Sequence, residues 1–243
     1  MNNESFLEDI TDDPIAAVAR YYASRLNENG KILDYLRRQA LFDPSETLGI
    51  GFSDRTLGKQ LPSNRIKAGR DLRAHLQIAG VLKSTGHETF RGFVTVPLCD
   101  LQGNISGIFG IRVDRSQGDE QHVTIGEGIF NAAALNSFEE LILCHGILDA
   151  WTFYAAGHKN AIVTSHVSHD QLTDKKRLLI ADPNCNDEPF QRIEVLRITI
   201  PSEKNVHDYA RDRINDPDAL GKRIRAATWI SGQPEPIEPP KIK

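Results

Sequence analysis

Cysteine is scarce in this sequence, and so are the patterns that accompany a structural role for it. The chain of 243 residues holds three cysteines, Cys99, Cys144 and Cys185, and no two of them form a C-x-x-C pair. This spacing argues against a disulfide framework and against a structural zinc site. Three separate thiols are typical of a protein that stays in the reducing cytoplasm.

Long apolar runs are also missing. No stretch approaches the roughly 18 apolar residues that a membrane span needs. The opening segment, MNNESFLEDITDD, is acidic and lacks the basic and then apolar pattern of a secretory signal. We therefore expect a cytoplasmic protein that does not interact with a membrane.

The chain has no excess of positive charge. Lys and Arg number 29 against 33 for Asp and Glu, which gives a net charge of −4 and a pI near 6.1. Contact with a phosphate backbone must therefore come from a local basic patch. The most basic window, residues 55–73, contains one acid, Asp71, and the cations Arg55, Lys59, Arg65, Lys67, Arg70 and Arg73. Such a charge run fits either a solvated helix face or a surface that follows phosphate groups.

The hydrophobic pattern predicts an α/β protein. Hydrophobic residues make up 40% of the chain, enough to bury a substantial core. In the first half, Asp13 and Pro14 predict a helix start, and the β-rich runs at 90–100 and 105–113 flank a turn, LQGN, and predict an antiparallel hairpin. From Ser137 onward apolar strands alternate with a helix, which predicts a mostly parallel sheet.

These patterns divide the chain into an α+β part followed by an α/β part. We expect an acidic N-terminal segment (1–13), an N-terminal subdomain of helices plus a hairpin (14–136), an α/β domain with a mostly parallel sheet (137–201), two C-terminal helices (202–231) and a proline-rich tail (232–243).

One stretch, ELILCHGILDAWTFYAAG at residues 140–157, predicts a buried strand that turns directly into a helix. His145 lies at the turn, where ligands bind in α/β sheets, because such sites form just outside the carboxyl ends of the strands. Cys144, at the end of the apolar run, is expected to be buried and inert. His145 is therefore a candidate functional residue.

Several phrases resemble the catalytic core of DnaG-type bacterial primases, and more closely the primase-like, Toprim-containing proteins of mobile elements. They are YYASRLNENGKILDYLRRQAL with LGIGFSD, FRGFVTVPLCDLQGNISGIFGIRV, EGIFNAAAL, LILCHGILDAWTFYAAGHKNA and KNVHDYARD. The resemblance covers roughly residues 14–231. It implies a primase-core subdomain followed by a Toprim-like domain, and an enzyme that joins ribonucleotides on a single-stranded DNA template with divalent metal ions held by acidic residues.

The acidic motifs of that family are only half kept. Its Glu-Gly-x-x-Asp turn reads His145, Gly146 and Asp149 here, and its Asp-x-Asp turn reads Asp182, Pro183, Asn184. Mg²⁺ prefers carboxylate oxygens, whereas imidazole suits softer ions such as Mn²⁺ or Zn²⁺. The segment CNDEPFQ is also too short for the helix that follows Asp-x-Asp in the family. The resemblance therefore implies a degenerate Toprim site, vestigial at His145, Asp149, Asp182 and Asn184.

Nucleotide contacts are implied by the same resemblance. The family uses basic residues in the first half to hold the incoming nucleotide and the template, and Arg91 and Arg112 stand at matching positions. A further arginine of that pattern is replaced by Phe93, and the lysine and tyrosine expected after the hairpin are matched only loosely by His122 and Val123. The cysteine spacing offers no ligands for the zinc module that the family also carries.

Three functions are compatible with these residues. The favoured one is a catalytically impaired primase-like protein that binds single-stranded DNA or RNA, or a protein partner, in a mobile-element or defence system and requires no cofactor. The second is an active, non-standard DNA primase that uses Asp149 and Asp182 with Mg²⁺ or Mn²⁺, with His145 as a further metal ligand. The third is a metal-dependent nuclease that adds the histidine-rich loop, His166, His169 and Asp170.

Overall fold

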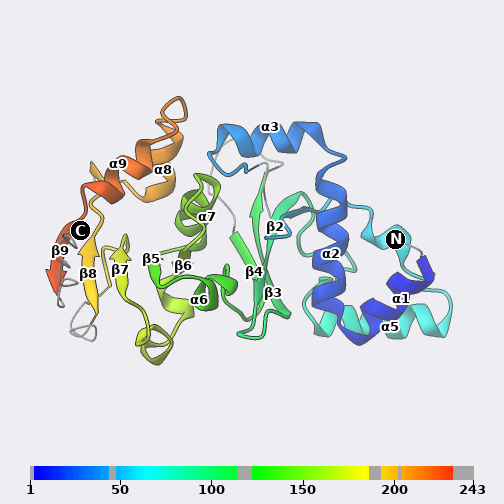
Figure 1. Ribbon diagram of the computed structural model, residues 1–243. Coiled ribbons are helices and arrows are strands. Elements are labelled where there is room, and N and C mark those ends of the chain that lie inside the picture. Colours follow the sequence, from blue (N-terminus) through cyan, green and yellow to red (C-terminus); the bar gives the residue numbers. More distant parts are fainter. Residues whose placement is uncertain (1–2, 44–47, 114–121, 186–192, 202–203, 232–243) are drawn as a thin grey trace, which may run out of the picture. The chain divides into compact units, whose positions relative to one another are not determined.

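A computed structural model describes residues 3–43, 48–113, 122–185, 193–201 and 204–231, and the chain divides into two compact units (Figure 1). Unit 1 comprises residues 1–132 and unit 2 comprises residues 133–243. The sequence pattern places the change at Ser137, whereas the division falls before helix α6 (Ala133–Ser137). The predicted tail at 232–243 lies outside the described residues.

The helices of unit 1 begin at the residues that cap them. They are α1 (Asn3–Asp12), α2 (Pro14–Leu26), α3 (Gly30–Arg38), α4 (Leu57–Gln60) and α5 (Lys67–Ile78). Asp13 accepts a hydrogen bond from the Ala16 N–H at 3.1 Å, and Pro14 occupies the first turn of α2, as the sequence predicts. Asn29 caps α3 in the same way.

An antiparallel sheet runs through unit 1 in the order β1-β2-β3-β4. Its strands are β1 (Gly51–Phe52), β2 (Phe93–Cys99), β3 (Ile105–Arg112) and β4 (His122–Gly126). The predicted hairpin of β2 and β3 is confirmed, with Val96 opposite Phe109. At its turn the Asp100 carboxylate accepts hydrogen bonds from the Gln102 and Asn104 N–H groups.

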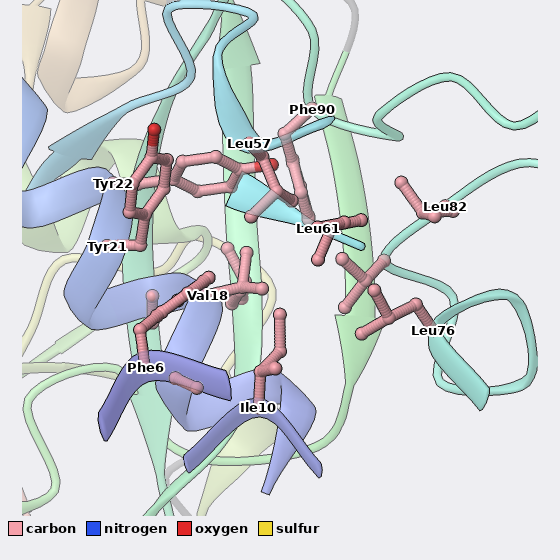
Figure 2. Packing of buried hydrophobic residues seen from close by; sticks show 14 of the residues in the cluster. Phe6, Ile10, Val18, Tyr21, Tyr22, Leu57, Leu61, Leu76, Leu82 and Phe90 are labelled. Atoms are coloured by element: carbon pink, nitrogen blue, oxygen red, sulfur yellow. The ribbon is translucent and has the colours of Figure 1, made fainter. Parts of the chain in front are cut away.

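Helix α2 supplies much of the apolar core that covers this sheet (Figure 2). Tyr22 is fully buried and packs edge-on against Phe90, which in turn packs edge-on against Phe93 of β2. Helix α1 adds Phe6 and Ile10, four residues apart and therefore on one helical face. The expected acidic segment 1–13 is thus largely a packed helix, because its few apolar residues share that face.

Unit 2 is built on a sheet with the strand order β6-β5-β7-β8-β9. The strands are β5 (Glu140–Cys144), β6 (Ala161–Val163), β7 (Arg177–Ile180), β8 (Glu194–Arg197) and β9 (Thr228–Ser231), and the helices after α6 are α7 (Ile147–Ala155), α8 (Val206–Arg211) and α9 (Ala219–Arg225). Strands β6, β5, β7 and β8 pair in parallel, which confirms the mostly parallel sheet.

The predicted second C-terminal helix is wrong over its last residues. Helix α9 ends at Arg225, and Thr228–Ser231 forms β9, antiparallel to β8. Thr, Trp and Ile favour strands, and pairing with β8 satisfies backbone groups that would otherwise lie at the sheet edge. Thr228–Ser231 therefore belongs to the sheet of unit 2 and is not the end of a helix.

Gly51 allows the backbone of α2 to approach β1 closely. A Cβ atom at this position would lie 2.5 Å from the Tyr22 carbonyl carbon. We expect Gly51→Ala to lower the free energy of unfolding by about 1–3 kcal/mol, because the strand or the helix must shift. Urea denaturation measures this loss. In the matched control, Gly58→Ala in α4, the added methyl group meets nothing within 4 Å, so its stability should be unchanged or slightly higher. Equal stability of the two variants would contradict the close approach.

Candidate functional site

The strand-turn-helix at β5 and α7 positions the candidate site. Leu141, Ile142 and Leu143 are buried in the sheet, and the chain turns at His145 and Gly146 into α7. Strand β7 runs parallel beside β5 and ends at Ile180, so Asp182 reaches the same edge of the sheet. The Leu143 carbonyl accepts hydrogen bonds from the Ala181 and Asp182 N–H groups, at 2.8 and 3.1 Å, which join the two strand ends.

Asp182 and His145 contact each other directly. The His145 Nδ1 atom lies 3.2 Å from Asp182 Oδ1, with the imidazole 61% exposed and the carboxylate 7% exposed. The same oxygen accepts a hydrogen bond of 2.9 Å from the Asn184 N–H. The contact is an ion pair when the imidazole is protonated. Asn184 contributes its backbone N–H, and the residue is exposed.

Asp149 is buried and is held by the start of α8. Its Oδ1 atom accepts a hydrogen bond of 3.0 Å from the His207 N–H. Burial raises the pKa of Asp149 above its ordinary value, while the His207 N–H and the nearby His145 act in the opposite direction. The carboxyl group thus accepts a hydrogen bond that joins the start of α8 to α7.

Thr152 reinforces this connection one turn further along α7. Its hydroxyl donates to the Leu148 carbonyl at 2.7 Å, and its oxygen lies 3.0 Å from His207 Nδ1. Because the hydroxyl proton is used by the carbonyl, His207 Nδ1 carries the proton of the second bond. Asp149, Thr152 and His207 are all buried and together join the two helices.

A cavity of about 590 Å³ opens beside these residues. His145, Asp149 and Asp182 line it, as do Arg197 at the end of β8 and Lys204 before α8. The remaining lining residues are Ala181, Pro183, Ile198, Thr199, Ile200, Asn205 and Val206. The structure thus brings three of the four residues of the predicted site to one cavity, while Asn184 does not line it.

The donor set does not fit a divalent metal centre. Among the described residues, no three His, Cys, Asp or Glu side chains converge as metal ligands. Asp149 and Asp182 each use an oxygen to accept a backbone hydrogen bond. A pair of dications needs several carboxylate oxygens at once, and within the described part of the chain only Asp149 and Asp182 bring carboxylates to this cavity.

The histidine-rich loop lies elsewhere. His166 and His169 belong to two short 3₁₀ helices, Thr164–His166 and His169–Leu172, and neither they nor Asp170 line the cavity. Cys144 is fully buried, as predicted, and burial raises the pKa of its thiol well above the ordinary value. Its thiolate is disfavoured, and the thiol is a poor nucleophile.

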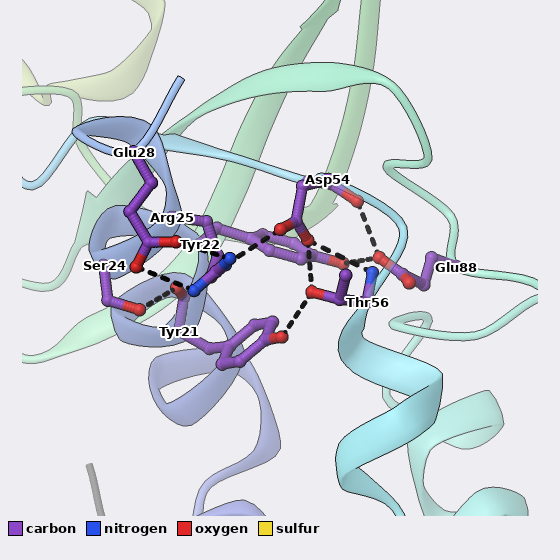
Figure 3. Close-up of polar contacts among 9 residues, drawn as sticks. Tyr21, Tyr22, Ser24, Arg25, Glu28, Asp54, Thr56 and Glu88 are labelled. Atoms are coloured by element: carbon purple, nitrogen blue, oxygen red, sulfur yellow. Dashed lines mark hydrogen bonds and ion pairs between the residues drawn. The ribbon is translucent and has the colours of Figure 1, made fainter. Parts of the chain in front are cut away.

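A polar network shapes the turn that begins the basic window (Figure 3). The Asp54 carboxylate pairs with Arg25 Nε at 2.8 Å and also accepts from the Thr56 N–H and hydroxyl. These bonds lower the pKa of Asp54, against the effect of its burial. Arg55, between them, has a positive φ of 69° and is exposed. The network therefore fixes the turn that presents Arg55.

Most of the predicted basic residues are on the surface. Arg55, Lys59, Arg65, Lys67 and Arg70 are exposed. Arg65 and Arg70 are also joined, because Arg70 Nη1 donates to the Arg65 carbonyl at 3.0 Å. Arg73 is half-buried and donates to the carbonyls of Gly58 and Pro62, so it supports the connection between α4 and α5.

The two arginines near the hairpin differ in their surroundings. Arg91 is exposed just before β2. Arg112 is half-buried at the end of β3 with its guanidinium carbon 5.3 Å from the centre of the Phe93 ring, its opposite residue in the sheet. Phe93 thus packs in the core and supports Arg112.

Solved structures of primase cores share this arrangement. The structure titled as the Aquifex aeolicus primase zinc-binding and RNA polymerase domains aligns over 95% of this chain and 63% of its own, with 15% identity and a TM-score of 0.64. A DnaG primase catalytic domain bound to single-stranded DNA aligns over 93% of this chain and 83% of its own, with 16% identity and a TM-score of 0.66. The fold resembles the DnaG primase catalytic core.

A Pseudomonas aeruginosa DNA primase domain is similarly close, with 19% identity, a TM-score of 0.63, and coverage of 88% of this chain and 78% of its own. No protein-family model and no curated protein matches the sequence. The chain spans less than two thirds of the Aquifex aeolicus chain. The α/β prediction, a primase-core subdomain followed by a Toprim-like domain, is confirmed as the DnaG-like fold, and identities at this level establish the fold alone.

Sequence reasoning missed four residues around the cavity. Thr152 and His207 bind each other from helices far apart in the sequence, and Arg197 and Lys204 reach the cavity from the segment that follows β7. Only the position of Arg197, at the carboxyl end of a strand, gave a signal that could have identified it.

None of the described helices is long and apolar enough to cross a membrane.

We expect Asp149→Ala to lower the free energy of unfolding by about 1–3 kcal/mol, because the buried His207 N–H loses its acceptor.

The Asp149→Asn variant keeps an acceptor oxygen but cannot ionise, so it tests the raised pKa of Asp149. The native protein binds more protons here than the unfolded chain, so the contribution of Asp149 to stability falls as pH rises between the two pKa values. The stability of Asp149→Asn relative to wild type should therefore increase from about pH 4 to about pH 7.

Urea denaturation across this range measures both effects. Asp170→Asn, which removes an exposed carboxylate outside the cavity, is the control for loss of charge alone. A relative stability of Asp149→Asn that is flat or falls with pH would show that burial does not raise this pKa.

Proposed function

We propose that this DnaG-like chain binds a single strand of nucleic acid, or joins a complex that does so, without catalysing nucleotidyl transfer. The observation that carries the proposal is that Asp149 and Asp182 both bind groups within the protein. Asp149 holds α8 and Asp182 holds His145 and the Asn184 backbone, so neither is set aside for metal ions. The Toprim-like site is then degenerate, with no cofactor required.

The start of α5 supports contact with phosphate groups. Arg65, Lys67 and Arg70 are exposed there, and the helix has neither a capping side chain nor an acid in its first turn. Cations at a helix N-terminus are unfavourable beside the positive end of the helix dipole. A bound phosphate relieves this repulsion, because it attracts both the side chains and the helix end.

Two of the similar solved structures contain DNA, which is a candidate partner for this surface. One of them is a DnaG catalytic domain bound to single-stranded DNA, and another, from Mycobacterium tuberculosis, is in complex with double-stranded DNA that carries a 6-nucleotide overhang. A chain that keeps the fold and a basic surface, but only two of the four acids of the family pattern, suits a strand-binding subunit. We place this subunit in a mobile-element or defence system of the cytoplasm, alongside a protein partner.

Strand binding should not need a metal. We expect labelled single-stranded DNA or RNA to bind in excess EDTA, with an affinity that falls as salt rises. The combined Arg65→Gln, Lys67→Gln and Arg70→Gln variant should bind more weakly and reduce the slope of log affinity against log salt by about 2, because each lost phosphate contact removes about 0.7. Fluorescence anisotropy measures both quantities.

The matched control neutralises Lys176, Arg213 and Arg225 in unit 2, which removes the same charge outside the basic window. Equal losses of strand affinity in the two triple variants would indicate only an effect of net charge on binding. If the wild-type protein binds neither DNA nor RNA, strand binding is wrong and a role confined to protein partners takes its place.

Primer synthesis separates the proposed function from an active, non-standard primase, which the shared cavity of Asp149 and Asp182 favours as the second candidate. We expect no template-dependent product with Mg²⁺ or Mn²⁺, assayed with labelled ribonucleotides on a single-stranded template. A product that disappears in Asp182→Asn, in a variant that keeps the wild-type thermal midpoint, would establish the enzyme and overturn the proposal.

A further inference from the structure

Unit 1 contains a buried acidic side chain, Glu88. It is 8% exposed and lies in the connection between α5 and β2, where it pairs with Leu82 in an isolated antiparallel bridge. Burial removes a carboxylate from water, which is unfavourable unless hydrogen bonds take the place of hydration. The contacts that replace water at Glu88 therefore indicate what this acid does.

Two hydroxyl groups bind one oxygen of Glu88. The Ser53 hydroxyl donates to Glu88 Oε2 at 2.6 Å, and the Tyr22 hydroxyl donates to the same atom at 3.2 Å (Figure 3). Burial raises the pKa of Tyr22 well above its ordinary value, and the charge of Glu88 acts in the same direction. The phenol therefore keeps its proton and remains a donor. One carboxylate oxygen thus joins α2, the residue after β1 and the segment before β2.

The same segment carries Arg91 on the surface. Phe90 and Gly92, on either side of it, are buried, whereas Arg91 is exposed. The Gly92 N–H donates to the Ser53 carbonyl at 3.1 Å, and the Arg91 N–H donates to the Glu88 carbonyl at 3.4 Å. The turn is therefore attached to Ser53 through its backbone and through the Glu88 side chain, and Arg91 lies between the two attachments.

A carboxylate at this position determines direction as well as packing. An apolar side chain would fill the same space without the cost of losing hydration. Hydrogen bonds have narrow preferred lengths and angles, so a buried network with satisfied partners favours one arrangement of the segments that it joins. Glu88 therefore restricts the turn to one position against α2 and β1 of the same unit.

We propose that Glu88 is a positioning residue for strand binding, which holds the turn at 88–92 so that Arg91 meets a phosphate group of the bound strand. Glu88 touches no nucleic acid and acts through Arg91. The inference rests on the proposed function, because it requires a bound strand, and it adds a buried acid on which the affinity depends.

The sign of the effect distinguishes positioning from net charge. Removal of an acid makes the protein less negative, so charge alone predicts tighter binding to a polyanion. We expect the opposite for Glu88→Leu, which leaves the Ser53 and Tyr22 hydroxyls without their acceptor. This variant should bind labelled single-stranded DNA or RNA about tenfold more weakly in excess EDTA, because Arg91 loses a charge-assisted hydrogen bond. The slope of log affinity against log salt should fall by about 0.7, the value for one phosphate contact, and fluorescence anisotropy measures both quantities.

Three further variants complete the comparison. Glu88→Gln keeps an acceptor oxygen for both hydroxyls and should restore binding close to that of wild type. Glu127→Gln is the matched control for charge, because it removes an exposed acid from unit 1, and it should bind as wild type does or slightly more tightly. Thermal melting shows whether each variant is folded. If Glu88→Leu is not folded, Ser53→Ala takes its place, because it removes the shorter bond to Glu88 and should weaken binding in the same direction.

A double variant tests whether Glu88 acts through Arg91. Arg91→Gln should weaken binding about tenfold, and its combination with Glu88→Leu, or with Ser53→Ala in its place, should bind no more weakly than Arg91→Gln alone. Losses that add in the double variant would give Glu88 a general structural role and overturn the inference. Wild-type affinity in Arg91→Gln, or in the partner variant used for the cycle, would overturn it as well.

The outcomes also separate this inference from the proposed function. If the wild-type protein binds a strand in EDTA and loss of the Glu88 contacts leaves that binding unchanged, the positioning role alone is rejected. If the wild-type protein binds neither DNA nor RNA, strand binding and the role of Glu88 are rejected together.

Discussion

The parallel pairing of β5 with β7 is the constraint on which the candidate site depends. Leu143 lies opposite Ile180, and its carbonyl binds the two N–H groups that follow β7. This pairing aligns the ends of β5 and β7. His145 and Asp182 therefore follow the strands side by side, and His145 Nδ1 lies 3.2 Å from Asp182 Oδ1. Helix α7 starts at the same turn and carries Asp149 to the same cavity. One local register therefore gathers residues that lie up to 37 positions apart.

Within that cavity the acids act mainly as hydrogen-bond acceptors inside the protein. Asp149 binds the start of α8, and Asp182 binds a turn and an imidazole. His145 reinforces this, since its Nδ1 atom lies 3.2 Å from the Asp182 carboxylate. Arg197 and Lys204 add positive charge. The sheet edge of this DnaG-like fold therefore carries charges of both signs, and its acids are held by hydrogen bonds within the protein.

Several elements followed from local pattern. The Asp13-Pro14 start of α2, the hairpin of β2 and β3, and the parallel strands of unit 2 are all confirmed. Helix α1 was missed because its acidic residues mask a short apolar face made by Phe6 and Ile10. Strand β9 was assigned to a helix because the residues before it are helical and its partner, β8, is distant in sequence. A strand at a sheet edge depends on that partner more than on its own residues.

The sequence by itself determined the fold class and the strand-turn-helix around His145, because strand ends and helix starts follow from local hydrophobic period and capping residues. The meeting of His145, Asp149 and Asp182 at one sheet edge was implied by the resemblance to primases, and the pairing of β5 with β7 brings it about. Tertiary structure alone decided what these residues do there. The bond from His207 to Asp149, the inward turn of Arg73 and the approach of Arg197 and Lys204 to the cavity all join segments distant in the chain. Burial and hydrogen-bond partners set the charge of a carboxyl group, and neither is encoded in its immediate neighbours.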